Sequence, residues 1–165
     1  MKSENNQNIE KLIEMVKESK VCMLITREKN DENLSGRPMT ISKIDDEGNL
    51  WFFTAASSYK IDELEENKKV SISITNESNN NYLMINGTGN LVKDKSKMKE
   101  LWSPILKAWF PLGLEDPDMI LIKVTPKEVN YWDSSSSKMV VLFNMIKAIV
   151  SGKVYDEGEH GKINL

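Results

Sequence analysis

The most informative stretch of the sequence is Trp51-Phe52-Phe53-Thr54-Ala55-Ala56-Ser57-Ser58-Tyr59-Lys60. Its aromatic first half is typical of a β-strand, and its second half predicts a hydroxyl-rich turn that opens a helix with a lysine in the first turn. Backbone N–H groups at a helix start, two serine hydroxyls and an ammonium can together hold a phosphate dianion. An ordinary serine cap beside a solvated lysine explains the same residues, and the spacing alone favours that plainer interpretation.

The flanking segments predict a protein built mainly from short strands. Apolar runs at residues 21–26 and 37–44 indicate a hairpin, and a turn at residues 45–49 leads into a strand at residues 50–54. Further strands are expected at residues 70–75, 82–92, 119–124 and 129–132, the last two around a turn at residues 125–126. Helices are expected at residues 9–16, 59–67 and 94–102. Such a pattern favours a small β-barrel with flanking helices over a parallel α/β sheet.

The length of 165 residues suits one compact domain. Residues 1–133 are expected to form the barrel together with an N-terminal helix. The character of the sequence changes at a run of four serines that begins at residue 134. We expect residues 134–165 to form a C-terminal helix, at residues 138–150, followed by a polar tail.

The composition argues against nucleic-acid and membrane partners and favours one cellular compartment. The net charge is −3 and only two of the cations, Arg27 and Arg37, are arginine, so no basic field for nucleic acid is expected. The longest apolar tract, residues 139–150, falls short of the roughly 20 residues that span a bilayer, so we expect no membrane anchor. The only cysteine, Cys22, cannot form an intrachain disulfide, which favours the cytoplasm.

Several kinds of chemistry are disfavoured. The one histidine, His160, stands apart from any metal-ligand spacing, so no metal site is expected. Cys22 lies in an apolar strand, where a buried, unreactive thiol is the expected state. Glycines at 87 and 89 lack the third glycine of a dinucleotide loop and are expected to mark a bulge or a close backbone approach. Trp102 and Trp109 could stack on a planar ligand or fill a core or interface, and the sequence leaves both interpretations open.

The order and spacing of several motifs resemble one known family. The motifs are Ser35-Gly36-Arg37-Pro38-Met39, Gly48-Asn49-Leu50-Trp51-Phe52-Phe53-Thr54, Ser58-Tyr59-Lys60, Asn86-Gly87-Thr88-Gly89, Leu101-Trp102-Ser103-Pro104, Ala108-Trp109-Phe110-Pro111 and Asp116-Pro117-Asp118. Over residues 9–133 the chain resembles the general stress protein 26 branch of the pyridoxamine 5'-phosphate oxidase-like family. The resemblance implies a split β-barrel that binds flavin mononucleotide (FMN) at the interface of a homodimer.

The resemblance also implies roles for individual residues. Residues 37–42 would run along the flavin, Phe53 and Thr54 would face the isoalloxazine, and Ser58 and Lys60 would hold the phosphate with Arg37 nearby. Tyr82 falls where the oxidases carry a glutamine that contacts the cofactor. The expected cofactor-binding set is Arg37, Pro38, Met39, Ser42, Phe53, Thr54, Ser58, Lys60, Tyr82, Trp102 and Trp109, the two tryptophans closing the site.

Two departures from the oxidases narrow the expected activity. Ser42 replaces the lysine that meets the substrate phosphate, and the final residues, 161–165, lack the Arg-Leu-x-Pro block that grips pyridoxamine phosphate. Pyridoxamine 5'-phosphate oxidation is therefore not expected, and no catalytic residue is named. The scarcity of arginine would also weaken the hold on FMN.

The sequence is compatible with two hypotheses for the function. The first is a flavin-dependent oxidoreductase of the general stress type, acting on a small substrate that the sequence does not identify. The second is a non-catalytic protein that binds, sequesters or senses flavin. Haem or a deazaflavin is a further option for the same barrel, although the position of His160 in the tail weighs against a histidine-ligated haem.

Overall fold

The computed structural model describes residues 4–78, 80–133, 145, 147–148, 150–152 and 159–165. Its elements, in chain order, are α1 (Glu4–Lys17), β1 (Val21–Arg27), β2 (Leu34–Thr40), β3 (Lys43–Ile44), β4 (Leu50–Ala55), α2 (Tyr59–Glu66), β5 (Lys69–Asn76), β6 (Asn81–Val92), α3 (Lys95–Leu101), the 3-10 turns η1 (Pro104–Ala108) and η2 (Gly113–Glu115), β7 (Met119–Asp133) and β8 (Glu159–Asn164). Within these residues, eight strands form one sheet in the order β2-β1-β5-β6-β7-β4-β3, with β8 paired to β7.

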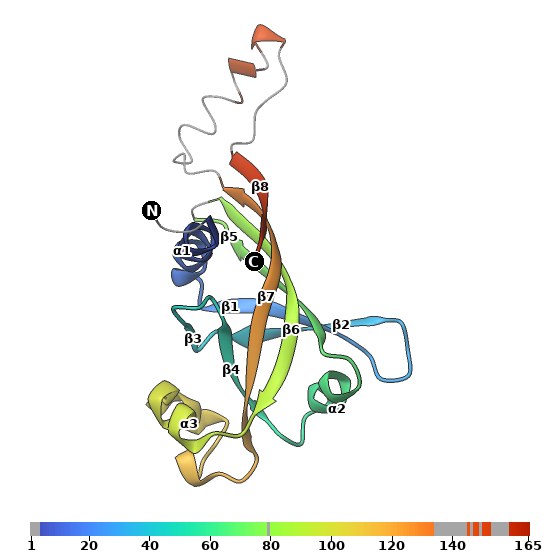
Figure 1. Cartoon of the computed structure of the whole chain (residues 1–165), viewed down its shortest axis with the longest axis vertical. Coiled ribbons are helices and arrows are strands. Elements are labelled where there is room, and N and C mark those ends of the chain that lie inside the picture. The colour runs from blue at the N-terminus through green and yellow to red at the C-terminus, as the bar shows by residue number, and fades with distance from the viewer. Residues whose placement is uncertain (1–3, 79, 134–144, 146, 149, 153–158) are drawn as a thin grey trace.

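The sheet is antiparallel and curls into a half-barrel, as Figure 1 shows. The long strands β6 and β7 run through its middle. Helix α1 lies against one end of the sheet, and α2 and α3 lie toward the other. This architecture confirms the prediction of a mainly β fold with flanking helices.

Alternating side chains build the core inside the curl of the sheet. Leu24 on β1 lies opposite Ile72 on β5, which lies opposite Ile85 on β6, and all three are fully buried. Leu12 and Val16 of α1 pack into the same cluster, so the predicted amphipathic helix buries its apolar stripe against the sheet. Burying this apolar face is the main stabilisation that the fold gains.

Two glycines on β6 permit close contacts that any side chain would block. A Cβ at Gly87 would lie 2.3 Å from the carbonyl oxygen of Thr125, at the point where the β6–β7 register shifts. A Cβ at Gly89 would lie 2.9 Å from a methyl carbon of Leu64 in α2. Gly87 therefore marks a bulge with a close backbone approach, which confirms the expected role of that glycine, whereas the close neighbours of Gly89 are side-chain atoms.

The structure corrects two predicted boundaries. The turn expected at residues 125–126 does not exist, because β7 runs without interruption from Met119 to Asp133. Pro126 lies opposite Gly87, where the bulge already disrupts the ladder, so its missing N–H costs little there. The strand expected at residues 37–44 is divided, since β2 pairs with β1 whereas Lys43 and Ile44 pair with β4.

The end of the chain adds a strand that the sequence analysis did not predict. Residues of the expected polar tail form β8, which pairs antiparallel with β7, and Ile163 in this strand is buried in the core. Most of the helix expected at residues 138–150 lies outside the described residues.

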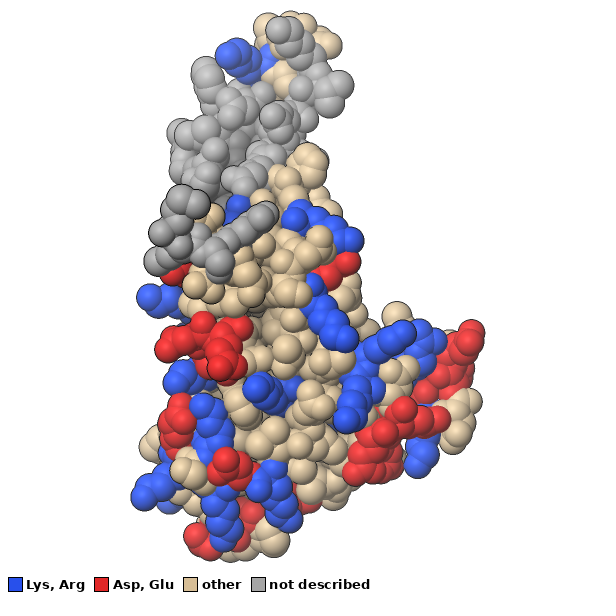
Figure 2. Space-filling view, in the orientation of Figure 1, with Lys and Arg blue, Asp and Glu red and all other residues tan. Residues whose placement is uncertain are grey.

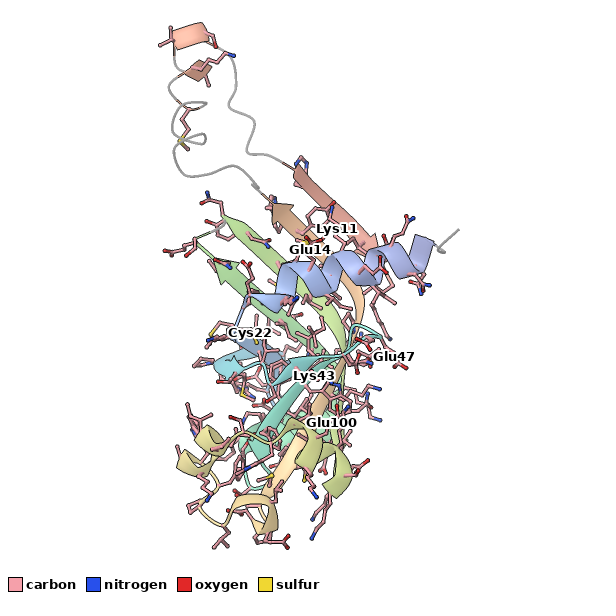
Figure 3. The ribbon with its side chains drawn as sticks, turned by 90° about the vertical axis from the view of Figure 1, so that its left-hand side faces the viewer. Lys11, Glu14, Cys22, Lys43, Glu47 and Glu100 are labelled. Carbon is pink, nitrogen blue, oxygen red and sulfur yellow. The ribbon has the colours of Figure 1, made fainter. Side chains whose placement is uncertain are left out.

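A second apolar cluster attaches α3 to the lower end of the barrel. Trp51 and Phe53 of β4 pack there with Met98 and Leu101 of α3. An ion pair strengthens this attachment at the surface, because the ammonium of Lys43 lies 2.9 Å from a carboxylate oxygen of Glu100; Figure 3 shows the two residues beside each other. The cluster fixes the segment that follows α3, including Trp102 and η1.

The surface carries charges of both signs. On the face in Figure 2, lysine and arginine side chains are interspersed with aspartate and glutamate. In the described part of the chain, no helix combines the length and the apolar character needed to cross a membrane.

The turn between β3 and β4 is organised by one carboxylate. Asp45 accepts hydrogen bonds from the backbone N–H groups of Glu47 and Asn49, at 3.0 and 2.9 Å, and from the indole N–H of Trp51 at 2.8 Å. Burial alone would raise the pKa of Asp45, but the hydrogen bonds from Trp51 and Asn49 outweigh it and leave the pKa lowered. The carboxylate thereby sets the start of β4, the strand that leads into the residues of interest.

We expect Asp45→Asn to lower the free energy of unfolding by about 2 kcal/mol at neutral pH, because it removes the charge from several hydrogen bonds. Since the folded pKa is lowered, the stabilisation is present above the unfolded pKa of about 3.9 and is lost as the pH falls toward the folded value. Urea unfolding at a series of pH values should therefore show the free energies of unfolding of wild type and Asp45→Asn converging as the pH falls. The neighbouring exposed Asp46→Asn serves as the control, and an equal loss in that variant would contradict the assignment.

Candidate functional site

The loop between β4 and α2 is held in a fixed shape by the start of β7. The backbone N–H and the hydroxyl of Ser57 both donate to the carboxylate of Asp118 at 2.8 Å. The N–H of Ala56 donates to the backbone carbonyl of Asp118. The Ser57 hydroxyl is thereby committed to the loop itself, and Ser58 is left as the serine that faces the start of α2.

Lys60 lies partly buried at the start of α2 with two hydroxyl partners. Its ammonium donates to Thr54 Oγ1 at 2.7 Å and to Ser58 Oγ at 2.9 Å. The Ser58 side chain makes no helix-capping hydrogen bond. The plainer interpretation of this stretch, a serine cap beside a solvated lysine, is therefore wrong, because both side chains are drawn together into one cluster.

Burial lowers the pKa of Lys60 most, and the positive charge of Arg37 lowers it further, while the carboxylate of Glu63 acts in the opposite direction. A cation that is partly removed from water and carries only neutral partners gains from an anion placed beside it. The cluster of Thr54, Ser58 and Lys60 is called the hydroxyl–lysine cluster below. Its chemistry suits a phosphoryl group or a carboxylate.

This cluster borders a cavity of about 430 Å³. Ligand sites in proteins are commonly lined by apolar and aromatic groups with a few polar groups that fix orientation. The cavity has this character, with Lys60 as its only charged lining residue. The lining residues are Pro38, Met39, Thr40, Ser42, Phe53, Thr54, Ala55, Lys60, Ile105, Leu106, Trp109 and Phe110.

Most of the predicted cofactor-binding residues meet at this cavity. Those that line it are Pro38, Met39, Ser42, Phe53, Thr54, Lys60 and Trp109, and Ser58 contacts Lys60. Trp102 does not line it but packs edge-on against Phe53, with ring centroids 6.3 Å apart, so it supports a lining residue. The assignment of these residues to a cofactor stays a prediction.

Arg37 is placed differently from the expectation that it runs along the ligand. Its Nη2 donates to Thr26 Oγ1 at 2.9 Å and to Glu63 Oε2 at 2.8 Å, and it does not line the cavity. Its Nη1 is buried and has no hydrogen-bond partner among the described residues. Arg37 therefore acts on Lys60 through its charge, and one of its donors is left without an acceptor.

Tyr82 lies away from the cavity of its own chain. It is on β6, opposite Thr75 and Trp132, and is 41% exposed on the outer face of the sheet. A single chain does not bring it to the hydroxyl–lysine cluster.

The part of the wall that η1 provides was not predicted from the sequence. Ile105 and Leu106 line the cavity and follow Pro104, which starts the 3-10 turn. The signal was present, because two adjacent apolar residues stand in a short segment between Trp102 and Trp109. A segment this short cannot bury apolar side chains on all sides, so some of them line an adjacent cavity.

Neither the cysteine nor a metal-ligand cluster offers a second site in the part of the chain that the structure describes. Cys22 is buried as predicted, and its burial raises the pKa of the thiol to about 12. Among the described residues, no group of three or more His, Cys, Asp or Glu side chains is arranged to hold a metal ion. The cavity beside Lys60 is therefore the strongest candidate for function.

The sequence is similar to a known protein family and to a protein of Neurospora crassa. The family profile described as pyridoxamine 5'-phosphate oxidase like matches residues 7–156. Protein bli-3 of Neurospora crassa is 26% identical over 157 residues, which cover 90% of this chain and 75% of that protein.

Solved structures share the fold. A structure assigned to general stress protein 26 from Jannaschia sp. matches with a TM-score of 0.76 at 22% identity, covering 94% of this chain and 97% of that one. A general stress FMN/FAD-binding protein from Xanthomonas citri matches with a TM-score of 0.68 at 26% identity, covering 79% of this chain and 92% of that one. The family profile spans most of the residues, and the fold is the split β-barrel of these neighbours. The chain therefore belongs to the pyridoxamine 5'-phosphate oxidase-like family.

Proposed function

We propose that this protein binds FMN in the cavity beside Lys60 and acts as a general-stress-type flavin-dependent oxidoreductase on a small substrate. The observation that carries the proposal is an ammonium held by two hydroxyls at one end of a cavity whose other walls are uncharged. The Xanthomonas citri neighbour is described as binding FMN or FAD, which supports a flavin as the ligand class.

The residues present fit FMN at both ends of the molecule. The phosphate would be held by Lys60, Ser58 and Thr54, in charge-assisted hydrogen bonds that are stronger than neutral ones. The isoalloxazine would lie against apolar and aromatic walls such as Phe53 and Trp109. Arg37 stays outside the cavity wall, and its charge acts on Lys60 from behind the cluster.

A bound flavin would supply hydride and electron transfer, and the chain would supply binding and orientation. Thr40 and Ser42 line the cavity, and their hydroxyls would hydrogen-bond the ring edge. Ile105, Leu106 and Trp109 would exclude water from one side. Because Ser42 replaces a lysine of the oxidases, the substrate side lacks a cation for a second phosphate, and vitamin B6 phosphates are not proposed as substrates.

A non-catalytic flavin-binding or sensing role is the second candidate. It is favoured by the lack of proton-transfer groups in the wall, because Lys60 is the only titratable side chain among the lining residues. Lys60 is also engaged with two hydroxyls, which suits binding more than proton transfer. The two candidates share the same site and differ only in whether the bound flavin turns over.

We further propose that two copies pair through the outer face of the sheet. Met23 on β1 lies opposite Ser73, which lies opposite Met84 on β6, so one row across this face is apolar at two of its positions. The neighbouring row carries Tyr82 and Trp132, both exposed. Large exposed apolar groups on one continuous face are typical of protein interfaces. In a dimer of this kind Tyr82 would reach toward the cavity of the partner.

The cytoplasm is the compartment that goes with this proposal. The one cysteine is a buried free thiol, which fits a reducing environment.

The first test is a titration of the purified protein with FMN and with riboflavin, followed by flavin fluorescence. We expect Lys60→Ala to weaken FMN binding by about 2 kcal/mol, roughly thirtyfold, because it removes the cation from the phosphate, and to change riboflavin binding little. Lys68→Ala, at an exposed lysine beyond the end of α2, is the matched control. An equal loss of affinity for FMN and riboflavin in Lys60→Ala would contradict the placement of the phosphate at Lys60.

The same titration has a pH dependence. Burial and the charge of Arg37 lower the pKa of Lys60, so its ammonium loses its proton at a lower pH than that of free lysine. FMN affinity should therefore fall on the alkaline side before an ordinary lysine would titrate. Lys60→Arg stays charged and should keep its affinity there. Parallel alkaline losses in both proteins would assign the pH effect to another group.

Turnover separates the two candidate functions. We expect anaerobic protein with bound FMN to be reduced by a nicotinamide donor, seen as loss of the oxidised flavin absorbance, and to be reoxidised by a small electron acceptor. Free FMN at the same concentration is the control. Bound flavin that is never reduced faster than free flavin would favour the non-catalytic role.

The oligomeric state tests the proposed interface. The wild-type protein should sediment as a dimer at micromolar concentration, and Met23→Glu should shift it toward monomer by placing a charge in an apolar face. Val150→Glu puts the same charge on an exposed apolar residue outside the sheet and should leave the dimer intact. A wild-type monomer, or two variants that behave alike, would exclude this face as the interface.

A further inference from the structure

A buried ion pair joins three elements behind the hydroxyl–lysine cluster. Arg37 on β2 and Glu63 on α2 lie 2.8 Å apart, with exposed side-chain fractions of 20% and 10%. Thr26 on β1 donates its hydroxyl to the same oxygen of Glu63 and accepts a hydrogen bond from Arg37. Glu63 therefore has two partners, and both lie on the hairpin of β1 and β2.

The Arg37–Glu63 pair also sets the net charge around the proposed phosphate site. Arg37 and Glu63 are the two charged side chains that shift the pKa of Lys60, and they act in opposite directions. Two cations and one carboxylate leave the region with a single unit of positive charge. A phosphate monoester carries about 1.5 to 2 negative charges at neutral pH, so this region leaves it incompletely neutralised.

Glu63 also restrains the arginine in space. The Nη2 of Arg37 is shared between Glu63 and Thr26, and the guanidinium stays outside the cavity wall. An arginine that is free of a carboxylate is a strong ligand for phosphate, because its guanidinium presents a fork of donors. The carboxylate thus competes with a ligand for the same cation.

We propose that Glu63 is a specificity-determining residue that limits the preference of this site for phosphorylated over unphosphorylated flavin. It does so by cancelling the charge of Arg37 and by holding the guanidinium against the hairpin. The ligand phosphate then meets the full charge of Lys60 alone. This inference rests on the proposed function, since it concerns the same cavity.

The test compares the ratio of the FMN and riboflavin dissociation constants in four proteins. Glu63→Gln keeps an oxygen that can accept from Arg37 and Thr26 but removes the charge, so the preference for FMN should rise about tenfold. Arg37→Met should lower the preference by a similar factor. The double variant Arg37→Met with Glu63→Gln removes both charges together and should return to within about threefold of wild type.

A second readout needs no flavin. Lysine side chains labelled for NMR report the titration of Lys60 directly, and we expect Glu63→Gln to lower its pKa and Arg37→Met to raise it. An unchanged titration in both variants would mean that neither charge acts on Lys60 and would overturn the proposal. The readout therefore measures the charge coupling itself.

The outcomes separate this inference from the proposed function. Wild-type protein that binds neither flavin removes both, whereas flavin binding with the same preference in Glu63→Gln overturns only the inference. Thermal unfolding checks that each variant is folded, since breaking a buried pair can cost stability. If Glu63→Gln does not fold, the double variant still tests the proposal, because it removes both charges together. A tenfold difference from wild type in its preference for FMN over riboflavin would overturn the proposal.

Discussion

The contact between Arg37 and Glu63 determines how the rest of the site is arranged. It is the ion pair that ties the β1–β2 hairpin to α2, and α2 carries Lys60 one helical turn before Glu63. Removing one partner would leave a largely buried charge without compensation, so the pair couples the helix to the hairpin. Because β4 enters α2 through a loop pinned by Asp118, the position of Lys60 is fixed from both sides.

Close packing of α2 on the sheet is the second condition for this arrangement. Leu64 lies over Gly89, where even one methyl group would be too close. The lack of a side chain at Gly89 gives Leu64 room to pack against this part of β6. The apolar segment after α3 completes the opposite wall through η1. The cavity thus forms between elements that are far apart in the sequence and that the half-barrel brings together.

The sequence predicted the local parts of this account well and the long-range parts poorly. The aromatic run before Thr54, the hydroxyl-rich turn and Lys60 are neighbours in the chain, so strand and helix-start rules were sufficient for them. Glu63 as the partner of Arg37 is a contact between a helix and a strand, and no local rule predicts it. Strand β8 was missed because its sequence is polar apart from Ile163 and it is stabilised by pairing with β7.

The central claim is that the start of α2 holds the phosphate of a flavin. The most direct measurement is a crystal structure of the protein soaked with FMN. We expect the phosphate within hydrogen-bond distance of the Lys60 ammonium, with the ring between Phe53 and Trp109. A flavin bound with its phosphate in solvent and Lys60 still paired only with Thr54 and Ser58 would contradict it.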